Sequence, residues 1–221
     1  MWIVERLLAL IAPHTCQSCG VEGVVLCQEC AITLPSIPSR CYRCNRATNE
    51  FRTCATCRRS SRLYAVWPVT TYRAAKGVSH KLKYERAQAA AADVARAIAR
   101  RATPAGAHFV ITHAPTAPAR VRERGYDQAA LVAKALSQIT GMPYVPLLVR
   151  SGNDRQVWQK RAGRREQMKE AFRAAQYPYP RSQHILLVDD VLTTGATCEA
   201  AALALCKAGA YRVSAVVFAV A

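Results

Sequence analysis

The chain has 221 residues, of which 51% are hydrophobic, and a formal net charge of +17. This length and composition fit one medium-sized domain with a hydrophobic core plus a small module. No apolar run approaches the roughly 20 residues that a membrane span needs, so a transmembrane segment is not expected. The charge favours polyanionic partners such as phosphates or nucleic acid, although an arginine-rich coding bias would produce the same excess.

The first 13 residues, MWIVERLLALIAP, are predicted to form a short amphipathic helix. Ile3, Leu7, Leu8 and Ile11 would share one face, which would pack on the body of the protein or on a partner. The segment lacks the basic start and the small-residue cleavage site of a signal peptide. A cytoplasmic location is therefore expected.

Eight of the ten cysteines form four Cys-x-x-Cys pairs within the first 57 residues. Each pair can place two thiolates on one tetrahedral metal, and two pairs complete a four-sulfur site with no open position. Four pairs predict two structural zinc ions, with iron–sulfur or redox thiols as alternatives. Sequential pairing, with a crossed arrangement as the alternative, gives the ligand sets Cys16, Cys19, Cys27, Cys30 and Cys41, Cys44, Cys54, Cys57.

Residues 1–62 are therefore expected to be a helix and a double zinc-ribbon module whose folding energy comes from the metal. The segment 40–62 carries seven arginines and a single acid, Glu50. Such a basic module would contact nucleic acid or, equally, an acidic partner. The two remaining cysteines, Cys198 and Cys206, lie in a predicted helix and are expected to be small core residues.

Residues 63–221 alternate between predicted strands and helices. Strands are expected at 64–72, where Pro68 suggests an interruption or a hairpin, and at 108–115, 144–150, 184–191 and 211–220. Helices are expected at 74–101, at 127–141 with Gly141 as the C-cap, and at 196–210. This alternation predicts an α/β fold, a parallel sheet with helices on both faces.

The most informative stretch is ILLVDDVLTTGAT, residues 185–197. Asp189 and Asp190 follow a continuous apolar strand, and ligands bind at the carboxyl ends of such strands. Two adjacent carboxylates need hydroxyl donors or a cation, which a ribose diol or Mg²⁺ would supply. The residues that follow can cradle a phosphate through backbone N–H groups, hydroxyls and a helix N-terminus: Thr193, Thr194, Gly195, Ala196 and Thr197.

This stretch resembles the phosphoribosyl-diphosphate (PRPP) binding signature of type I phosphoribosyltransferases. The whole chain resembles the ComF family, in which a cysteine-rich zinc module precedes a phosphoribosyltransferase domain. Further marks of the resemblance are HKLKYER (80–86), RERGYDQ (122–128) and RQVWQKRAGRREQMKEAF (155–172). Tyr126 and Asp127 replace the aromatic and the amide of the usual Arg-Gly-Phe-Asn-Gln, and Ala114-Pro115 replaces Val-Pro.

The resemblance implies that Asp189 and Asp190 hold the ribose hydroxyls with Mg²⁺, and that residues 193–197 hold the 5′-phosphate. A loop of Pro115, Thr116, Ala117 and Arg120 would face the pyrophosphate, with Arg122, Arg124 and Gln128 as weaker candidates at its rim. Residues 151–170 would form a hood whose cations are Arg161, Arg164 or Arg165. His113 lies near this site but is more typical of a structural histidine.

Two functions fit these features. The first is a Mg²⁺-dependent phosphoribosyltransferase with an acceptor that the sequence does not name. The second is a non-catalytic adaptor that binds single-stranded DNA or a helicase-like competence partner, with PRPP as a regulatory ligand. The resemblance also implies a role in natural transformation, the handling of incoming single-stranded DNA, or in the use of DNA as a nutrient.

Overall fold

The computed structural model describes residues 14–85, 87–102, 109–150, 171–175 and 183–221. The N-terminal segment 1–13 and the hood 151–170, including Arg161, Arg164 and Arg165, lie outside the described residues. Within the described part of the chain, every helix is too short or too polar to cross a bilayer.

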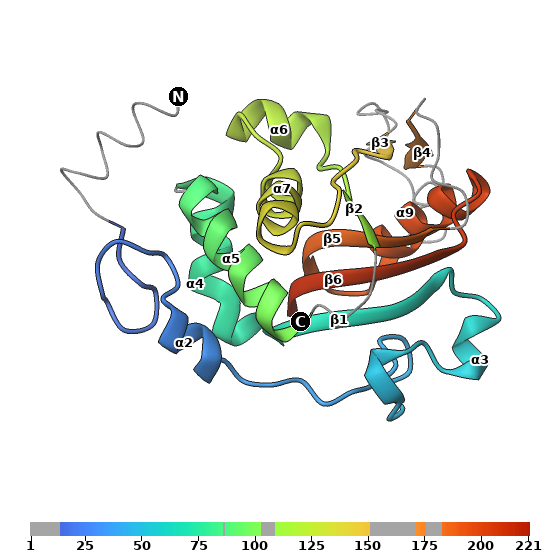
Figure 1. Ribbon diagram of the computed structural model, residues 1–221, viewed down its shortest axis with the longest axis horizontal. Coiled ribbons are helices and arrows are strands. Elements are labelled where there is room, and N and C mark those ends of the chain that lie inside the picture. Colours follow the sequence, from blue (N-terminus) through green and yellow to red (C-terminus); the bar gives the residue numbers. More distant parts are fainter. Residues whose placement is uncertain (1–13, 86, 103–108, 151–170, 176–182) are drawn as a thin grey trace, which may run out of the picture.

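The centre of the fold is a four-stranded parallel sheet with the order β1-β6-β5-β2 (Figure 1). Its strands are β1 (Leu63–Thr71), β2 (Phe109–His113), β5 (His184–Leu192) and β6 (Arg212–Val220). In the two central strands, residues 185–188 of β5 and 213–219 of β6 are buried, which explains their continuous apolar sequences. The expected parallel sheet is confirmed.

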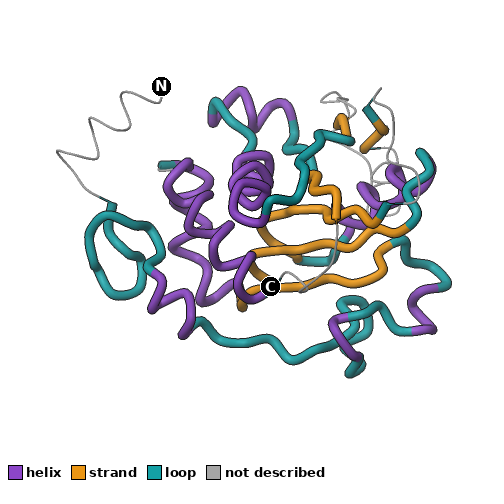
Figure 2. The backbone as a smooth tube through the Cα atoms, in the orientation of Figure 1, coloured by secondary structure: helices purple, strands orange, loops and turns teal. Residues whose placement is uncertain are grey.

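Helices cover both faces of this sheet (Figure 2). One face packs against α4 (Tyr72–Tyr84), α5 (Ala87–Arg101) and α7 (Gln128–Thr140), and the other against α9 (Ala196–Lys207). The short helix α6 (Pro118–Arg124) follows β2 and was not predicted. Helix α7 ends at Gly141, whose φ of 72° gives the expected left-handed C-cap.

Three local predictions were right only in part. Strand β1 runs through Pro68 without a hairpin, because β1 is an edge strand and an edge tolerates a residue without an N–H donor. The helix expected over 74–101 is two helices, since α4 ends at Glu85, where φ is −130°. The strand expected over 144–150 is reduced to β3 (Leu148–Arg150), which pairs antiparallel with β4 (Phe172–Ala174).

The cysteine-rich region wraps along β1 and meets the sheet domain at two places (Figure 1). The first part includes α2 (Gln28–Thr33) and packs on α5, where Val25, Leu26, Ala31 and Leu34 join one hydrophobic core with residues of the sheet. The second part includes the 3₁₀ helix η1 (Asn49–Phe51) and α3 (Ala55–Arg58). It attaches to β1, where Trp67 Nε1 donates to the Glu50 carbonyl at 2.9 Å.

Candidate functional site

Asp189 and Asp190 lie at the carboxyl end of β5, although the strand continues through them to Leu192. The Asp190 N–H donates to Asp189 Oδ1 at 2.9 Å, and Asp190 Oδ1 accepts from the Val191 N–H at 2.8 Å. Burial, followed by the charge of Asp190, raises the pKa of Asp189 to about 8. The Asp189 carboxyl group thus lies in an environment that disfavours its charged form.

Lys83 of α4 partly offsets this charge. Its Nζ lies 2.8 Å from Asp190 Oδ2, an ion pair between two partly buried side chains. Lys83 is thus the partner of Asp190 Oδ2, which accepts no further hydrogen bond from the described residues. A buried carboxylate oxygen with spare acceptor capacity suits a ribose hydroxyl or a hard cation such as Mg²⁺.

The loop 193–197 joins this strand end to α9. Thr193 and Thr194 are exposed, whereas Gly195 is buried with a φ of 75° and precedes the first helical residue, Ala196. Thr194 Oγ1 accepts from the Ala196 N–H at 3.4 Å. The exposed hydroxyls stand beside the N-terminus of a 12-residue helix, an arrangement that favours an anion.

The predicted pyrophosphate loop follows β2, the neighbour of β5 in the sheet. Pro115, Thr116 and Ala117 are half-buried, and Arg120 is exposed on α6. Asp127 accepts from the Thr116 N–H at 2.7 Å and caps α7 by accepting from the Ala129 N–H at 3.0 Å. The carboxylate of Asp127 therefore orders this loop.

The histidine and the rim residues are tied to their neighbours. His113 is 8% exposed, its Nδ1 lies 3.0 Å from the Tyr144 hydroxyl, and burial lowers its pKa. Arg124 donates to Gln128 Oε1 at 3.0 Å. These contacts fit the structural role expected for His113.

A hollow of about 520 Å³ lies along α4. It is bounded by α4 and by Gln17 of the first cysteine module, and Lys83 belongs both to its lining and to the ion pair with Asp190. Two further lysines, Lys76 and Lys81, make its walls basic.

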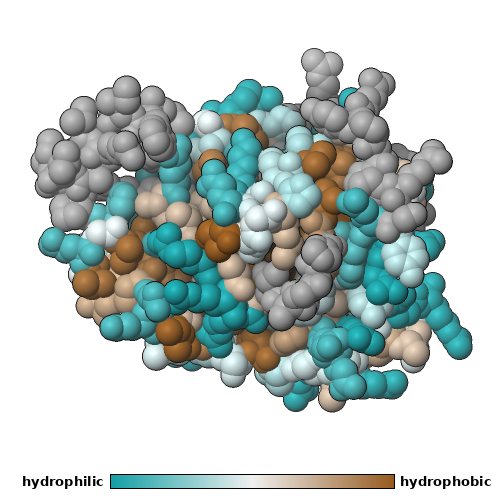
Figure 3. Space-filling model, in the orientation of Figure 1, coloured by the Kyte–Doolittle hydropathy of each residue, from teal (hydrophilic) through white to brown (hydrophobic). Residues whose placement is uncertain are grey.

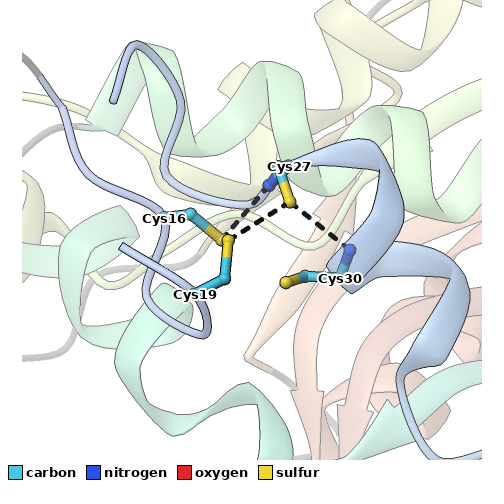
Figure 4. A group of neighbouring side chains, drawn as sticks. All are labelled: Cys16, Cys19, Cys27 and Cys30. Carbon is cyan, nitrogen blue, oxygen red and sulfur yellow. Dashed lines mark hydrogen bonds between the residues drawn. The ribbon is translucent and has the colours of Figure 1, made fainter. Parts of the chain in front are cut away.

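The eight Cys-x-x-Cys residues form two groups of four, as sequential pairing predicts. Within each group the sulfur atoms lie within 4.8 Å of one another, and the side chains of the first group face one another (Figure 4). The Cys19–Cys27 and Cys44–Cys54 sulfur separations are 3.7 and 3.6 Å. Sulfurs held about 2.3 Å from a tetrahedral zinc would be roughly 3.8 Å apart. Both groups could therefore bind zinc.

None of the ten cysteines forms a disulfide. Burial alone would raise the pKa of Cys16 and Cys41, but N–H groups that point at their sulfurs outweigh burial and lower each pKa to about 6. Thiolates are the form that binds zinc. In α9, Cys198 is buried and Cys206 half-buried, which confirms Cys198 as a core residue.

Along the chain, two four-cysteine groups precede a parallel α/β domain. This domain carries an aspartate pair beside a threonine-rich loop. No protein-family model matches the chain. It is 33% identical over 102 residues to competence protein ComFC of Bacillus subtilis (strain 168). The match covers 46% of this chain and only 40% of the relative's length. Over these 102 residues the chain is therefore similar to a ComF-type protein, as the sequence motifs suggested.

Three solved structures are similar to parts of this chain. The allosteric regulatory enzyme of purine biosynthesis matches at 18% identity and a TM-score of 0.44, over 63% of this chain and 30% of that one. The glutamine phosphoribosylpyrophosphate amidotransferase of B. subtilis, complexed with ADP and GMP, has the same identity and coverage and a TM-score of 0.46. Adenine phosphoribosyltransferase of Leishmania tarentolae matches at 21% identity and 0.37, over 65% and 60%. We assign the fold from the strand order of the sheet and the helices that cover its two faces.

Sequence reasoning gave no role to three residues that the structure brings to this site. Lys83 belongs to the HKLKYER stretch, which was noted only as a family mark. Tyr42 stands between two cysteine ligands, and Glu199 in the first turn of α9. Their meeting depends on contacts between distant segments, which a single sequence does not reveal.

Proposed function

We propose that this protein is a PRPP-binding, phosphoribosyltransferase-like member of the ComF family that acts in natural transformation or DNA utilisation. The observation that carries the proposal is the aspartate pair at the end of β5 beside the phosphate-type loop 193–197. Carboxylates that bind a diol, next to a loop that binds a monophosphate, match the two polar ends of ribose 5-phosphate.

In this proposal Asp189 and Asp190 accept hydrogen bonds from the ribose hydroxyls, and Thr193 to Thr197 bind the 5′-phosphate. Asp190 Oδ2, whose partner among the described residues is the Lys83 ammonium, would also help hold Mg²⁺. Bound Mg²⁺ would neutralise charge on the pyrophosphate leaving group. Lys83 would then exchange its contact with Asp190 for one with a ligand oxygen.

The loop Pro115, Thr116, Ala117 with Arg120 would contact the pyrophosphate. As pyrophosphate departs, the ribose becomes oxocarbenium-like, so the protein must stabilise negative charge on the leaving group and exclude water. Basic residues of the hood, Arg161, Arg164 or Arg165, are proposed to complete this environment.

The two four-cysteine groups are proposed as structural zinc sites within an N-terminal module, residues 1–62, followed by the phosphoribosyltransferase-like domain, residues 63–221. Zinc-bound thiolates persist in a reducing compartment, which supports the cytoplasm as the location. Zinc binding would supply folding energy for segments with little regular secondary structure.

A basic surface where the second four-cysteine group meets β1 and β6 supports a nucleic-acid partner. The guanidinium carbons of Arg52, Arg58 and Arg212 lie 5.5, 4.8 and 4.1 Å from the ring centroid of Tyr64. Tyr211 beside them is 68% exposed. The region over α3 is largely hydrophilic in Figure 3. Arginines bind phosphates and exposed aromatics stack on bases, so single-stranded DNA fits this surface.

The second candidate is an adaptor without catalysis, for which PRPP is a regulatory ligand and a helicase-like competence protein the partner. The position of His113 favours it, since that histidine is buried and held by Tyr144 and does not resemble an open general base. Pyrophosphate release in the presence of candidate acceptors distinguishes the two candidates.

Calorimetric titration of the zinc-loaded protein with PRPP and Mg²⁺ tests the proposal. The wild type should bind one PRPP, and the variant with Asp189→Asn and Asp190→Asn should bind about 100-fold more weakly, because two charge-assisted contacts are lost. The variant should still bind single-stranded DNA. Failure of the wild type to bind PRPP would refute the proposal.

A further inference from the structure

The second four-cysteine group packs directly on the phosphate-type loop. Tyr42, between Cys41 and Cys44, places its ring against the backbone of Gly195. A β-carbon added at Gly195 would lie 2.8 Å from Cε2 of Tyr42, too close for any other residue type. The loop therefore rests on an aromatic ring supplied by the metal-binding turn.

Hydrogen bonds join the same turn to helix α9. The Tyr42 hydroxyl donates to Glu199 and lies 2.9 Å from Ser61 Oγ, while the Arg62 N–H donates to Glu199 Oε2 at 3.0 Å. The Glu199 N–H in turn donates to the Gly195 carbonyl at 2.9 Å. Burial and the contact with Glu199 raise the pKa of Tyr42 far above its ordinary value, so the hydroxyl stays a donor.

The first four-cysteine group has no such link among the described contacts. It attaches to α5 on the other side of the sheet domain, where Asp93 accepts from the Val25 and Leu26 N–H groups (Figure 1). The two metal sites therefore bear on different parts of the fold.

We propose that Tyr42 is a positioning residue for the 5′-phosphate loop, and that zinc on Cys41, Cys44, Cys54 and Cys57 sets the affinity of this loop for its ligand. The inference rests on the proposed function, because it takes residues 193–197 as the phosphate cradle. Without the metal, nothing cross-links the four cysteines, so the turn that carries Tyr42 would open and withdraw the ring from Gly195.

The test compares two ligand fragments, ribose 5-phosphate and pyrophosphate, each titrated with Mg²⁺ into zinc-loaded protein. Tyr42→Ala and Cys44→Ser should weaken ribose 5-phosphate binding about ten-fold and pyrophosphate binding less than about two-fold. Tyr42→Phe keeps the ring and should fall between wild type and Tyr42→Ala. Arg43→Ala, a neighbouring exposed change in the same turn, is the matched control and should bind both fragments normally.

Hydrogen exchange of the amides at 195–199 gives a readout that needs no ligand. These amides should exchange faster in Tyr42→Ala and Cys44→Ser than in wild type, and Cys19→Ser, which removes a ligand of the first group, should affect them less. Wild-type affinity for ribose 5-phosphate in Tyr42→Ala, or an equal loss for pyrophosphate, would overturn the inference. If the wild type binds neither fragment, the proposed function fails. Unchanged hydrogen exchange of the 195–199 amides in Tyr42→Ala would separately overturn the positioning role of Tyr42.

Discussion

Asp93 on α5 anchors the first cysteine module, and its replacement should destabilise the whole chain. Its Oδ2 accepts from the Val25 N–H at 2.7 Å and from the Leu26 N–H at 2.9 Å, and its side chain also pairs with Arg96. Asp93 is 3% exposed, and Val25 and Leu26 are 1% and 3% exposed. Asp93→Ala would leave two buried N–H groups without an acceptor.

A buried donor without an acceptor costs about 1–3 kcal/mol, so Asp93→Ala should lower the free energy of unfolding by about 2–5 kcal/mol. For a chain of this length, the unfolding temperature should fall by roughly 5–15 °C. Asp93→Asn keeps an acceptor oxygen and loses only the charge beside the half-exposed Arg96, so it should cost about 1 kcal/mol or less.

Urea unfolding followed by far-UV circular dichroism measures these differences, and a chromogenic chelator measures zinc release. Because Leu26 directly precedes Cys27, one of the two zinc equivalents should leave Asp93→Ala faster than it leaves the wild type. Equal stability of the Ala and Asn variants, or unchanged release of both equivalents, would refute this view of the anchor.

Three further predictions concern the site and the basic surface. Folding favours protonated Asp189, whose pKa is raised from 3.8 to about 8, so wild-type stability should decline as pH rises through that range. Asp189→Asn should therefore raise the unfolding temperature more at pH 8 than at pH 4, and an equal change at both would contradict the shift. Gly195→Ala should abolish ribose 5-phosphate binding and should destabilise the fold more than Gly141→Ala does. Both glycines have a positive φ, but a β-carbon added at Gly141 would meet no atom within 4 Å. The unfolding temperature of Gly195→Ala should therefore be lower than that of Gly141→Ala. Replacing Arg58 and Arg212 by Ala should weaken single-stranded DNA binding and reduce its salt dependence in fluorescence anisotropy, and an unchanged salt slope would exclude this surface.

Local patterns predicted the sheet well because its strands are buried on both faces. The apolar runs at 185–188 and 212–220 became the central strands, and Gly141 ended α7 where its freedom to adopt a positive φ was needed. The short strand β4 and the break at Glu85 escaped prediction. No proline or glycine marks the break at Glu85. The three-residue strand β4 is defined by its pairing with β3, which a local sequence pattern does not show.

The site was predictable in part. The aspartates and the threonine loop are contiguous in sequence, so their chemistry could be read directly. The contacts Lys83–Asp190 and Tyr42–Glu199 join residues 107 and 157 positions apart. Only the folded chain brings them together, because they depend on how α4 and the second cysteine group dock on the sheet.

A crystal structure of the zinc-loaded protein with PRPP and Mg²⁺ would test the central claim most directly. We expect the 5′-phosphate on Thr193–Thr197, with the ribose hydroxyls on Asp189 and Asp190. Density for PRPP in the hollow beside α4 or among the arginines around Tyr64, with the loop 193–197 empty, would contradict it.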